Sequence, residues 1–220
     1  ESNEAFSLQL SEVKNAVIAK TAGIATIIDS SSWTQVVGTA ALDTVSYQGA
    51  RSNYTVASTG SGFTVVDNSA GGRTDLLLGV ERIKFADMNL GLDINGTGGQ
   101  TYRIYQAAFD RTPDAAGLGF WISSMDKGSS LEQVAAGFMK SAEFIKVYGA
   151  NPSSQDLVSK IYTNVLHRPV EKAGLDYWVG ALDAHHVSPA QALSLISESA
   201  ENQAAVLTVI ANGFPYAPFG

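Results

Sequence analysis

The spacing of hydrophobic residues changes twice along the chain. Near the N-terminus, Leu10, Val13 and Val17 recur every three to four residues, which predicts a helix through roughly residue 20. From about residue 43 the period becomes two, and after residue 99 it returns to that of a helix. We therefore expect an α+β protein in three parts: an N-terminal helix and linker over residues 1–42, a β-rich segment over 43–99, and a two-unit helical domain with a C-terminal tail over 100–220.

The middle segment has the pattern of several short strands. Residues 54–58 and 63–67 alternate apolar and polar side chains on either side of Thr59-Gly-Ser-Gly62, which is a hairpin signal. Further strands are expected around residues 76–78, 83–85 and 90–92, with turns at close spacing. Five or six such strands predict either a small antiparallel sheet or a β-solenoid-like end.

One helical signature occurs twice in the last part. The first copy reads Y105-Q-A-A-F-D-R-T-P-D-A-A-G-L-G-F-W121, and the second reads Y162-T-N-V-L-H-R-P-V-E-K-A-G-L-D-Y-W178. Each copy continues through an apolar-periodic stretch to a Ser-Ala-Glu, at 141–143 and at 199–201. A unit repeated at a fixed period stacks on its copy, because it cannot bury its apolar face alone. Serines that are good N-caps precede two of the expected helices, either Ser130 or Ser129 before the first and Ser188 before the second, and Pro189 suits a first helical position.

The signature residues have two interpretations each. Trp121 and Trp178 lie beside leucines on predicted helices, which favours anchors that wedge helices together, and the rival interpretation makes them platforms for stacking sugars. Arg111 and Arg168 can bind a carboxylate or phosphate ligand bidentately. The alternative is that each arginine ties down its own loop through the acid three residues on, which also caps the next helix.

Composition limits the classes of function. The chain has 14 Lys and Arg against 21 Asp and Glu, a net charge of −7, so it lacks the basic footprint expected for binding DNA, RNA or an anionic membrane. It has no cysteine, which excludes disulfides and thiolate chemistry. We also expect no membrane span, because no apolar run approaches the length of about 18 residues that a span requires. No Lys or Arg follows Lys172.

The repeated string resembles a known helical family. F109-D-R-T-P-D-x-x-G-L-x-F-W121, preceded by Y102-R-I-Y-Q-A-A, is similar to the family known as domain of unknown function 4214, over about residues 102–201. The second copy departs from the pattern, with Val170 and Glu171 in place of Pro-Asp. The resemblance implies a helical fold and no particular activity.

The upstream strands carry a second resemblance. D43-T-V-S-Y-Q-G-A-R-S-N-Y-T-V and G-G-R-T-D75-L-L-L-G-V-E-R-I-K-F-A-D87 look like the β segment that follows calcium-binding nonapeptide repeats in RTX-type bacterial proteins exported by type I secretion. That resemblance implies an acidic, cysteine-free protein with an export signal poor in basic residues. The nonapeptide repeat itself is absent from this sequence.

One loop has oxygen donors at alternate positions. Asp93, Asn95 and Thr97 begin like an EF-hand loop, but the later acids of that loop are missing. The first interpretation is an Asn-Gly turn between a strand and a helix, with Thr97 or Thr101 as the cap. The sharper hypothesis is a calcium ion bound jointly with Asp75 or Asp87.

The sequence holds no recognisable catalytic motif. The adjacent His185 and His186 lie between two predicted helices, where a solvated loop is favoured over metal ligation, and there is no H-E-x-x-H, G-x-S-x-G or phosphate-binding glycine loop.

We therefore expect a non-enzymatic C-terminal module of a secreted or cell-surface bacterial protein, with a structural, assembly or secretion role and a calcium association. Its partners would be other protein domains or cell-surface components. The alternative is a glycan- or ligand-binding module that uses the aromatics Tyr102, Trp121, Tyr177 and Trp178.

Overall fold

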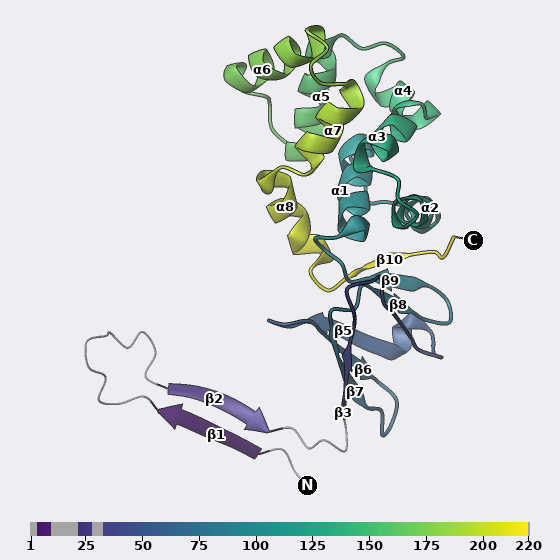
Figure 1. Cartoon of the computed structure of the whole chain (residues 1–220), viewed down its shortest axis with the longest axis vertical. Coiled ribbons are helices and arrows are strands. Elements are labelled where there is room, and N and C mark those ends of the chain that lie inside the picture. Colours follow the sequence, from purple (N-terminus) through teal and green to yellow (C-terminus); the bar gives the residue numbers. More distant parts are fainter. Residues whose placement is uncertain (1–3, 10–21, 28–32, 220) are drawn as a thin grey trace.

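The structure is a computed structural model that describes residues 4–9, 22–27 and 33–219, the first two ranges as backbone only. A β region lies at one end and a helical region at the other, and the chain's last residues return to the β region (Figure 1). This arrangement confirms the α+β class with an all-helical part after the strands.

The first two strands form a hairpin. β1 (Glu4–Gln9) pairs with β2 (Ala22–Ile27) in antiparallel register, with Glu4 opposite Ile27. Residues 4–9 are thus a strand where a helix was expected, which corrects that part of the prediction. The rest of the expected helix, residues 10–21, lies outside the described residues. The sequence holds the reason: Phe6 and Leu8 alternate with polar residues, a period of two that the wider apolar spacing obscured.

Two four-stranded sheets make up the rest of the β region. One has the order β3-β7-β6-β5 and the other β10-β9-β8-β4. The strands of the first are β3 (Trp33–Val37), β5 (Tyr54–Ser58), β6 (Phe63–Asp67) and β7 (Thr74–Leu78), with the 3-10 turn Arg51–Asn53 before β5. Those of the second are β4 (Thr44–Ser46), β8 (Arg82–Lys84), β9 (Asn89–Gly91) and β10 (Phe214–Tyr216).

The predicted hairpin is present, and the sheets are mixed. β5 pairs with β6 in antiparallel register, with Tyr54 opposite Asp67. The pairs β3–β7 and β4–β8 are parallel, and each joins strands far apart in sequence, which leaves room for the long connection that a parallel pair needs. Apolar side chains from both sheets share one core around Val65, Leu77 and Ile83, which are almost fully buried.

The helical region is built from two similar units of four helices. The first unit is α1 (Thr97–Phe109), α2 (Ala115–Asp126), α3 (Leu131–Met139) and α4 (Ala142–Tyr148). The second is α5 (Ser154–Leu166), α6 (Lys172–Asp183), α7 (Pro189–Ser197) and α8 (Ala200–Ile210). Both predicted serine caps are confirmed, since Ser130 accepts the N–H of Gln133 and Ser188 that of Gln191. In the described part of the chain, no helix is long and apolar enough to cross a membrane.

Two apolar clusters hold the helical region together. The larger joins both units, with α1 packed on α5 and α3 packed on α7. The smaller joins α1 and α2 to α8 and the C-terminal strand through Leu118, Ile122, Val206, Ile210 and Phe214. The phenyl ring of Phe214 lies so close to β9 that a Cβ at Gly91 would be 2.4 Å from it. The tail is therefore part of the fold and joins the helices to the sheet.

Candidate functional site

The two signature arginines form the same ion pair in both units. Arg111 donates through Nε and Nη2 to the two carboxylate oxygens of Glu143, at 2.7 and 3.0 Å. Arg168 does the same with Glu201, at 2.8 and 2.9 Å. Each glutamate belongs to the repeated Ser-Ala-Glu, whose serine caps the last helix of the unit. The repeat therefore fixes the loop before its second helix to the start of its fourth helix.

A tyrosine lies under each guanidinium. The Arg111 guanidinium carbon is 5.2 Å from the Tyr105 ring centre, and that of Arg168 is 5.4 Å from the Tyr162 ring centre. In the first unit, the Tyr105 hydroxyl donates to Asp114 at 2.5 Å and accepts from Arg111 at 3.2 Å. Each arginine therefore makes these contacts with residues of its own unit, as predicted by the interpretation in which it holds its own loop in place.

The ion pairs shift the protonation of their carboxylates. Hydrogen bonds from Arg111 and Arg168 lower the pKa of Glu143 and Glu201 below that of an ordinary glutamate. The Tyr105 hydroxyl, with the Gly117 amide, lowers the pKa of Asp114. Burial, followed by the bond to Asp114, raises the pKa of Tyr105. Each group is held in its usual neutral-pH state, with the carboxylates ionised and the Tyr105 hydroxyl protonated.

The two indoles pack against the helical core. Trp121 is half-buried, and its ring meets that of Phe138 edge to face with centres 4.9 Å apart. Trp178 is also half-buried, and its Nε1 donates to the Tyr162 hydroxyl at 3.2 Å. Of the other aromatics proposed for glycan stacking, Tyr102 is buried and Tyr177 is 65% exposed. This placement favours the anchor interpretation for both tryptophans.

Asp93 lies at the junction of sheet and helices. Its Oδ2 accepts the N–H of Gly98 at 2.8 Å in the first turn of α1, and its other oxygen forms an ion pair with the buried Arg82. Burial raises the pKa of Asp93, and the positive charge of Arg82 opposes that rise. Neither threonine is the cap we expected, because the N-cap residue is Gly96 and the hydroxyl of Thr101 donates to the Thr97 carbonyl. The longer reach of the Asp93 side chain supplies the acceptor instead.

The other residues of the calcium hypothesis lie elsewhere. Asp75 accepts the Tyr47 hydroxyl at 2.9 Å, and Asp87 accepts the Arg51 amide at 2.8 Å. Asn95 is exposed beside Asp93, and Thr97 contacts the Asp93 carboxylate at 3.5 Å. Across the residues that the structure describes, no three His, Cys, Asp or Glu side chains are grouped to hold a metal ion. Calcium binding thus stays a prediction from the sequence, and Arg82 already supplies the positive charge beside Asp93.

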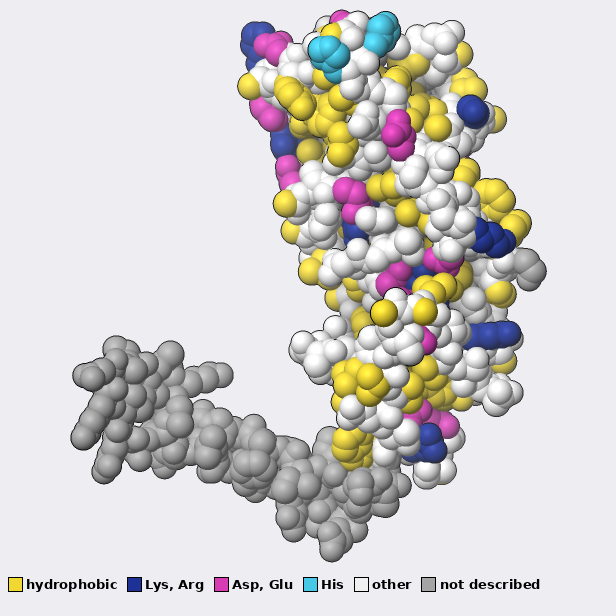
Figure 2. Space-filling view, viewed as in Figure 1, with side chains coloured by type: hydrophobic (Ala, Val, Ile, Leu, Met, Phe, Trp, Pro, Cys, Tyr) yellow, Lys and Arg dark blue, Asp and Glu magenta, His cyan; other side chains and the backbone are white. Residues whose placement is uncertain are grey.

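The histidine pair is solvent-exposed at the turn between α6 and α7. In the space-filling view, histidine side chains are seen only at the far end of the helical region, away from the sheets (Figure 2).

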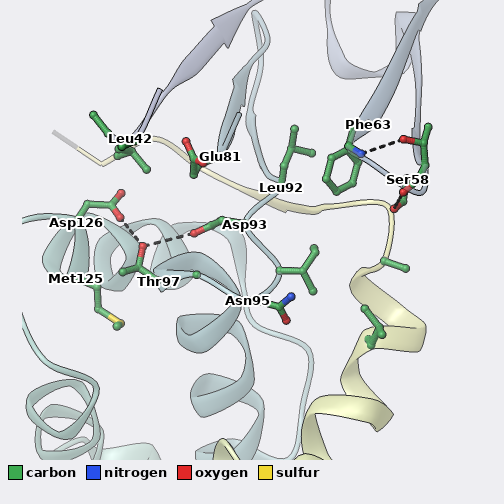
Figure 3. Close-up of a pocket in the computed structure, with 18 residues that line it drawn as sticks. Leu42, Ser58, Phe63, Glu81, Leu92, Asp93, Asn95, Thr97, Met125 and Asp126 are labelled. Carbon is green, nitrogen blue, oxygen red and sulfur yellow. Dashed lines mark hydrogen bonds between the residues drawn. The ribbon is translucent and has the colours of Figure 1, made fainter. Parts of the chain in front are cut away.

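A cavity of about 930 Å³ opens between the sheets and the helices. The β5–β6 hairpin, the residues around Glu81, the start of α1, the end of α2 and α8 all contribute to its walls. Figure 3 shows Glu81 and Asp126 near Leu42 at one end, and Phe63 and Ser58 at the other. Neither Trp121 nor Trp178 lines it. No residue of the duplicated signature lines this cavity, but the loop residues Asp93, Asn95 and Thr97, which the sequence marked as oxygen donors, do line it.

Comparison with known families separates the two regions. Residues 101–147 and 135–206 match the sequence model of one family. The helical region matches DUF4214, a domain of unknown function. The matches begin in α1 and end in α8, so the DUF4214 region contains both units and leaves the β region outside. Searches of curated proteins and of solved structures gave no match. The family resemblance of the helical part is thus supported, and the RTX-like resemblance of the strands stays a prediction.

The sequence predicted one partner of each arginine and missed the other. Arg111 and Arg168 form ion pairs with the expected Asp114 and Glu171, at 3.6 and 2.6 Å. Their two-pronged bonds to Glu143 and Glu201, more than thirty positions away in sequence, were not predicted. A signal existed, because Ser-Ala-Glu recurs after both copies of the signature. An acid repeated in step with an arginine indicates a pair that the fold brings together.

Proposed function

We propose that this chain is a non-enzymatic structural and docking module of a secreted or cell-surface bacterial protein. One observation carries the proposal: the residues that the duplication repeats are engaged with one another inside each unit. Arg111 and Arg168 bind glutamates of their own unit, and Trp121 and Trp178 pack on the helical core. Residues kept for an external ligand would instead point into a shared cleft.

The export part of the proposal rests on charge. No Lys or Arg follows Lys172, and the RTX-like resemblance supplies a reason for such a C-terminus. We expect the whole chain, fused to a reporter, to be exported through a matching type I system. A double variant, Gln203→Lys with Ala204→Lys, places two charges on exposed positions of α8 and should reduce export. The matched control, Gln155→Lys with Thr163→Lys, adds two charges at exposed positions of α5, upstream of Lys172, and should leave export unchanged. Absence of export of the parent fusion would contradict the secretion role.

The rival proposal is a glycan-binding module, and exposed aromatics favour it. Tyr177 is 65% exposed and Phe120 is 41% exposed. A glycan array of the whole chain separates the two functions, with Tyr177→Ala as the variant that would lose binding. For the structural role we expect no glycan bound, and Trp121→Ala should lower the free energy of unfolding by about 2 kcal/mol, less than for a fully buried ring. A glycan signal abolished by Tyr177→Ala would replace our proposal.

Calcium association is tested separately. Isothermal titration of the whole chain with millimolar calcium should give heat that Asp93→Asn removes if the sequence hypothesis is right. A titration without heat would exclude it, and the structural role would stand.

A further inference from the structure

The cavity between the sheets and the DUF4214 region has two chemically different ends. Glu81, Asp93 and Asp126 provide carboxylates from the β region, the first turn before α1 and the end of α2. Phe63 provides apolar surface at the opposite end, with Leu92 between the two (Figure 3). Leu207 of α8 adds apolar surface to the walls. These residues come from segments far apart in sequence, so only the fold creates this combination.

The acidic end keeps a negative charge after its internal pairing. Arg82 lies behind the cavity with its side chain 3% exposed, between Asp93 and Asp126. Asp93 and Asp126 therefore share one guanidinium, and Glu81 has no cationic partner in the ion pairs of the described residues. Its Oε2 accepts only the amide of Asp43, at 2.9 Å. The Asp93 side chain is 7% exposed, and its Oδ1 is paired with Arg82. Glu81 is therefore the carboxylate of this end that is left for a further cationic donor.

The size of the cavity matters as much as its charge. A volume of about 930 Å³ is near the upper end of the range of roughly 300–1,000 Å³ that is typical of ligand sites. It holds more than one side chain. Leu207 lines the cavity and is still 48% exposed. Apolar surface is therefore left for an occupant to cover.

We propose that this cavity binds a lysine or arginine side chain flanked by an apolar residue, presented by an extended segment of a partner protein. The ammonium or guanidinium group donates to Glu81 and the neighbouring carboxylates, and the apolar neighbour packs against Phe63 and Leu207. This inference names a partner for the docking role proposed above and rests on it. Charge complementarity selects the basic side chain, because the cavity offers carboxylate acceptors, no Lys or Arg is among the residues that line it, and Arg82 behind it is already paired.

A bare calcium ion fits the same walls less well. Calcium requires six to eight oxygen ligands around one point. Here Asp93 and Asp126 both face Arg82, which repels a divalent ion at that point. An N–H donor on a flexible aliphatic stem can reach Glu81 without displacing Arg82.

The test uses the whole chain at about 150 mM salt, where general charge attraction is screened over roughly 8 Å. The probe is a fluorescein-labelled hexapeptide with blocked ends that contains Lys followed by Phe among Gly and Ser residues. Two twin peptides replace the Lys by norleucine or the Phe by Ser. Fluorescence polarisation should give the tightest binding for the parent peptide, with weaker binding of both twins.

Matched variants locate the binding. Glu81→Gln keeps an oxygen for the Asp43 amide, and it should weaken the parent peptide about tenfold, the loss expected for one charge-assisted hydrogen bond. Leu207→Ser should weaken it about threefold by removing apolar contact. The controls are Asp176→Asn and Leu195→Ser, which make the same chemical changes at exposed positions that do not line the cavity; both should bind within about twofold of the parent chain. Circular dichroism confirms that each variant is folded.

Several outcomes would overturn the inference. Equal binding of the norleucine twin would show that no basic group is recognised. Equal weakening by Asp176→Asn would reduce the effect to the net charge of −7. Displacement of the peptide by putrescine at the same concentration would assign the cavity to free amines. If neither the peptide nor any glycan binds, this inference is wrong and the proposed docking function stands. If a glycan binds on the array, the docking function itself is contradicted.

Discussion

The two units of the DUF4214 region share one ion pair and differ in what covers their second helix. In the first unit the C-terminal tail lies over α2: the amide of Ala217 donates to the Ala115 carbonyl at 2.9 Å, and Leu118 beneath is fully buried. In the second unit no such segment covers α6 among the described residues. There Lys172 and Asp176 form an exposed ion pair on the helix, and Leu175 is only half-buried.

The residues under the tail explain this difference. Gly119 lets the tail approach α2, since a Cβ there would lie 1.8 Å from the carbonyl oxygen of Ala217. The equivalent position in α6 is Asp176, whose side chain blocks such an approach. A single small residue therefore decides whether a helix of this repeat is covered by backbone or by solvent.

The caps differ in the same way. Asp114 accepts the Gly117 amide at 2.7 Å and caps α2, whereas Glu171 makes no side-chain cap and pairs with Arg168 at 2.6 Å. Aspartate is short enough to reach back to the N–H groups of its own helix, and glutamate is not. The same acid position therefore caps the helix as well as facing the arginine in the first unit, and only pairs with the arginine in the second. The pairs of Arg111 and Arg168 with Glu143 and Glu201 are alike in both units.

The largest effect should come from the buried leucine. Leu118→Ala should lower the free energy of unfolding by about 3 kcal/mol, and Leu175→Ala by about 1 kcal/mol, because only the first is enclosed by the tail. Urea denaturation of both variants measures the difference. Equal losses would mean that the tail adds nothing to the first unit.

Replacing one glycine in each second helix by alanine should change the free energy of unfolding by smaller amounts, with opposite signs in the two units. Gly119→Ala should destabilise by about 1–2 kcal/mol, because the new methyl group pushes the tail away. Gly180→Ala in α6 meets open space and should stabilise by about 0.5–1 kcal/mol through helix propensity. Hydrogen exchange at Phe214 and Tyr216 gives a local check, since only Gly119→Ala should speed it. Two changes of the same sign would contradict the coverage difference.

The smallest effect concerns what the two units share. The lowered pKa values of Glu143 and Glu201 contribute stability above the ordinary glutamate pKa of 4.5, and that contribution is lost as the pH falls through the folded-state values. Because the Arg111 and Arg168 side chains are 39% and 38% exposed, solvent screens both pairs to a similar extent.

We therefore expect Arg111→Gln and Arg168→Gln to flatten, by similar amounts, the decline of the melting temperature between pH 6 and pH 3. Melting curves at several pH values test this. Asp93 acts in the opposite sense, because its pKa is raised by burial, and it is unchanged in both variants. If one arginine carried the whole pH dependence, the two pairs would not be equivalent.

Local patterns predicted much of the fold. The helical spacing, the serines at Ser130 and Ser188 and the Thr59–Gly62 turn led to the elements that the structure contains. The errors arose where two local patterns conflict, or where no local pattern predicts which strands will pair. The N-terminal residues 4–9 have both spacings, and the parallel pairing of β3 with β7 joins residues about forty positions apart.

The candidate sites also differ in whether a local pattern in the sequence predicts them. The anchor role of Trp121 and Trp178 follows from apolar neighbours on the same helix, which a sequence displays. The pairing of Arg82 with Asp93 and Asp126, and the cavity beside it, could not be predicted, because those residues carry no shared spacing.

By itself, the sequence determined that this protein has strands followed by a duplicated helical unit, since hydrophobic period, caps and repetition are properties of adjacent residues. Only the tertiary structure decided that the tail seals α2, that each arginine reaches a distant glutamate, and that carboxylates and apolar side chains share one cavity. Those features depend on which distant segments pack together, and packing is set by shape and burial over the whole fold.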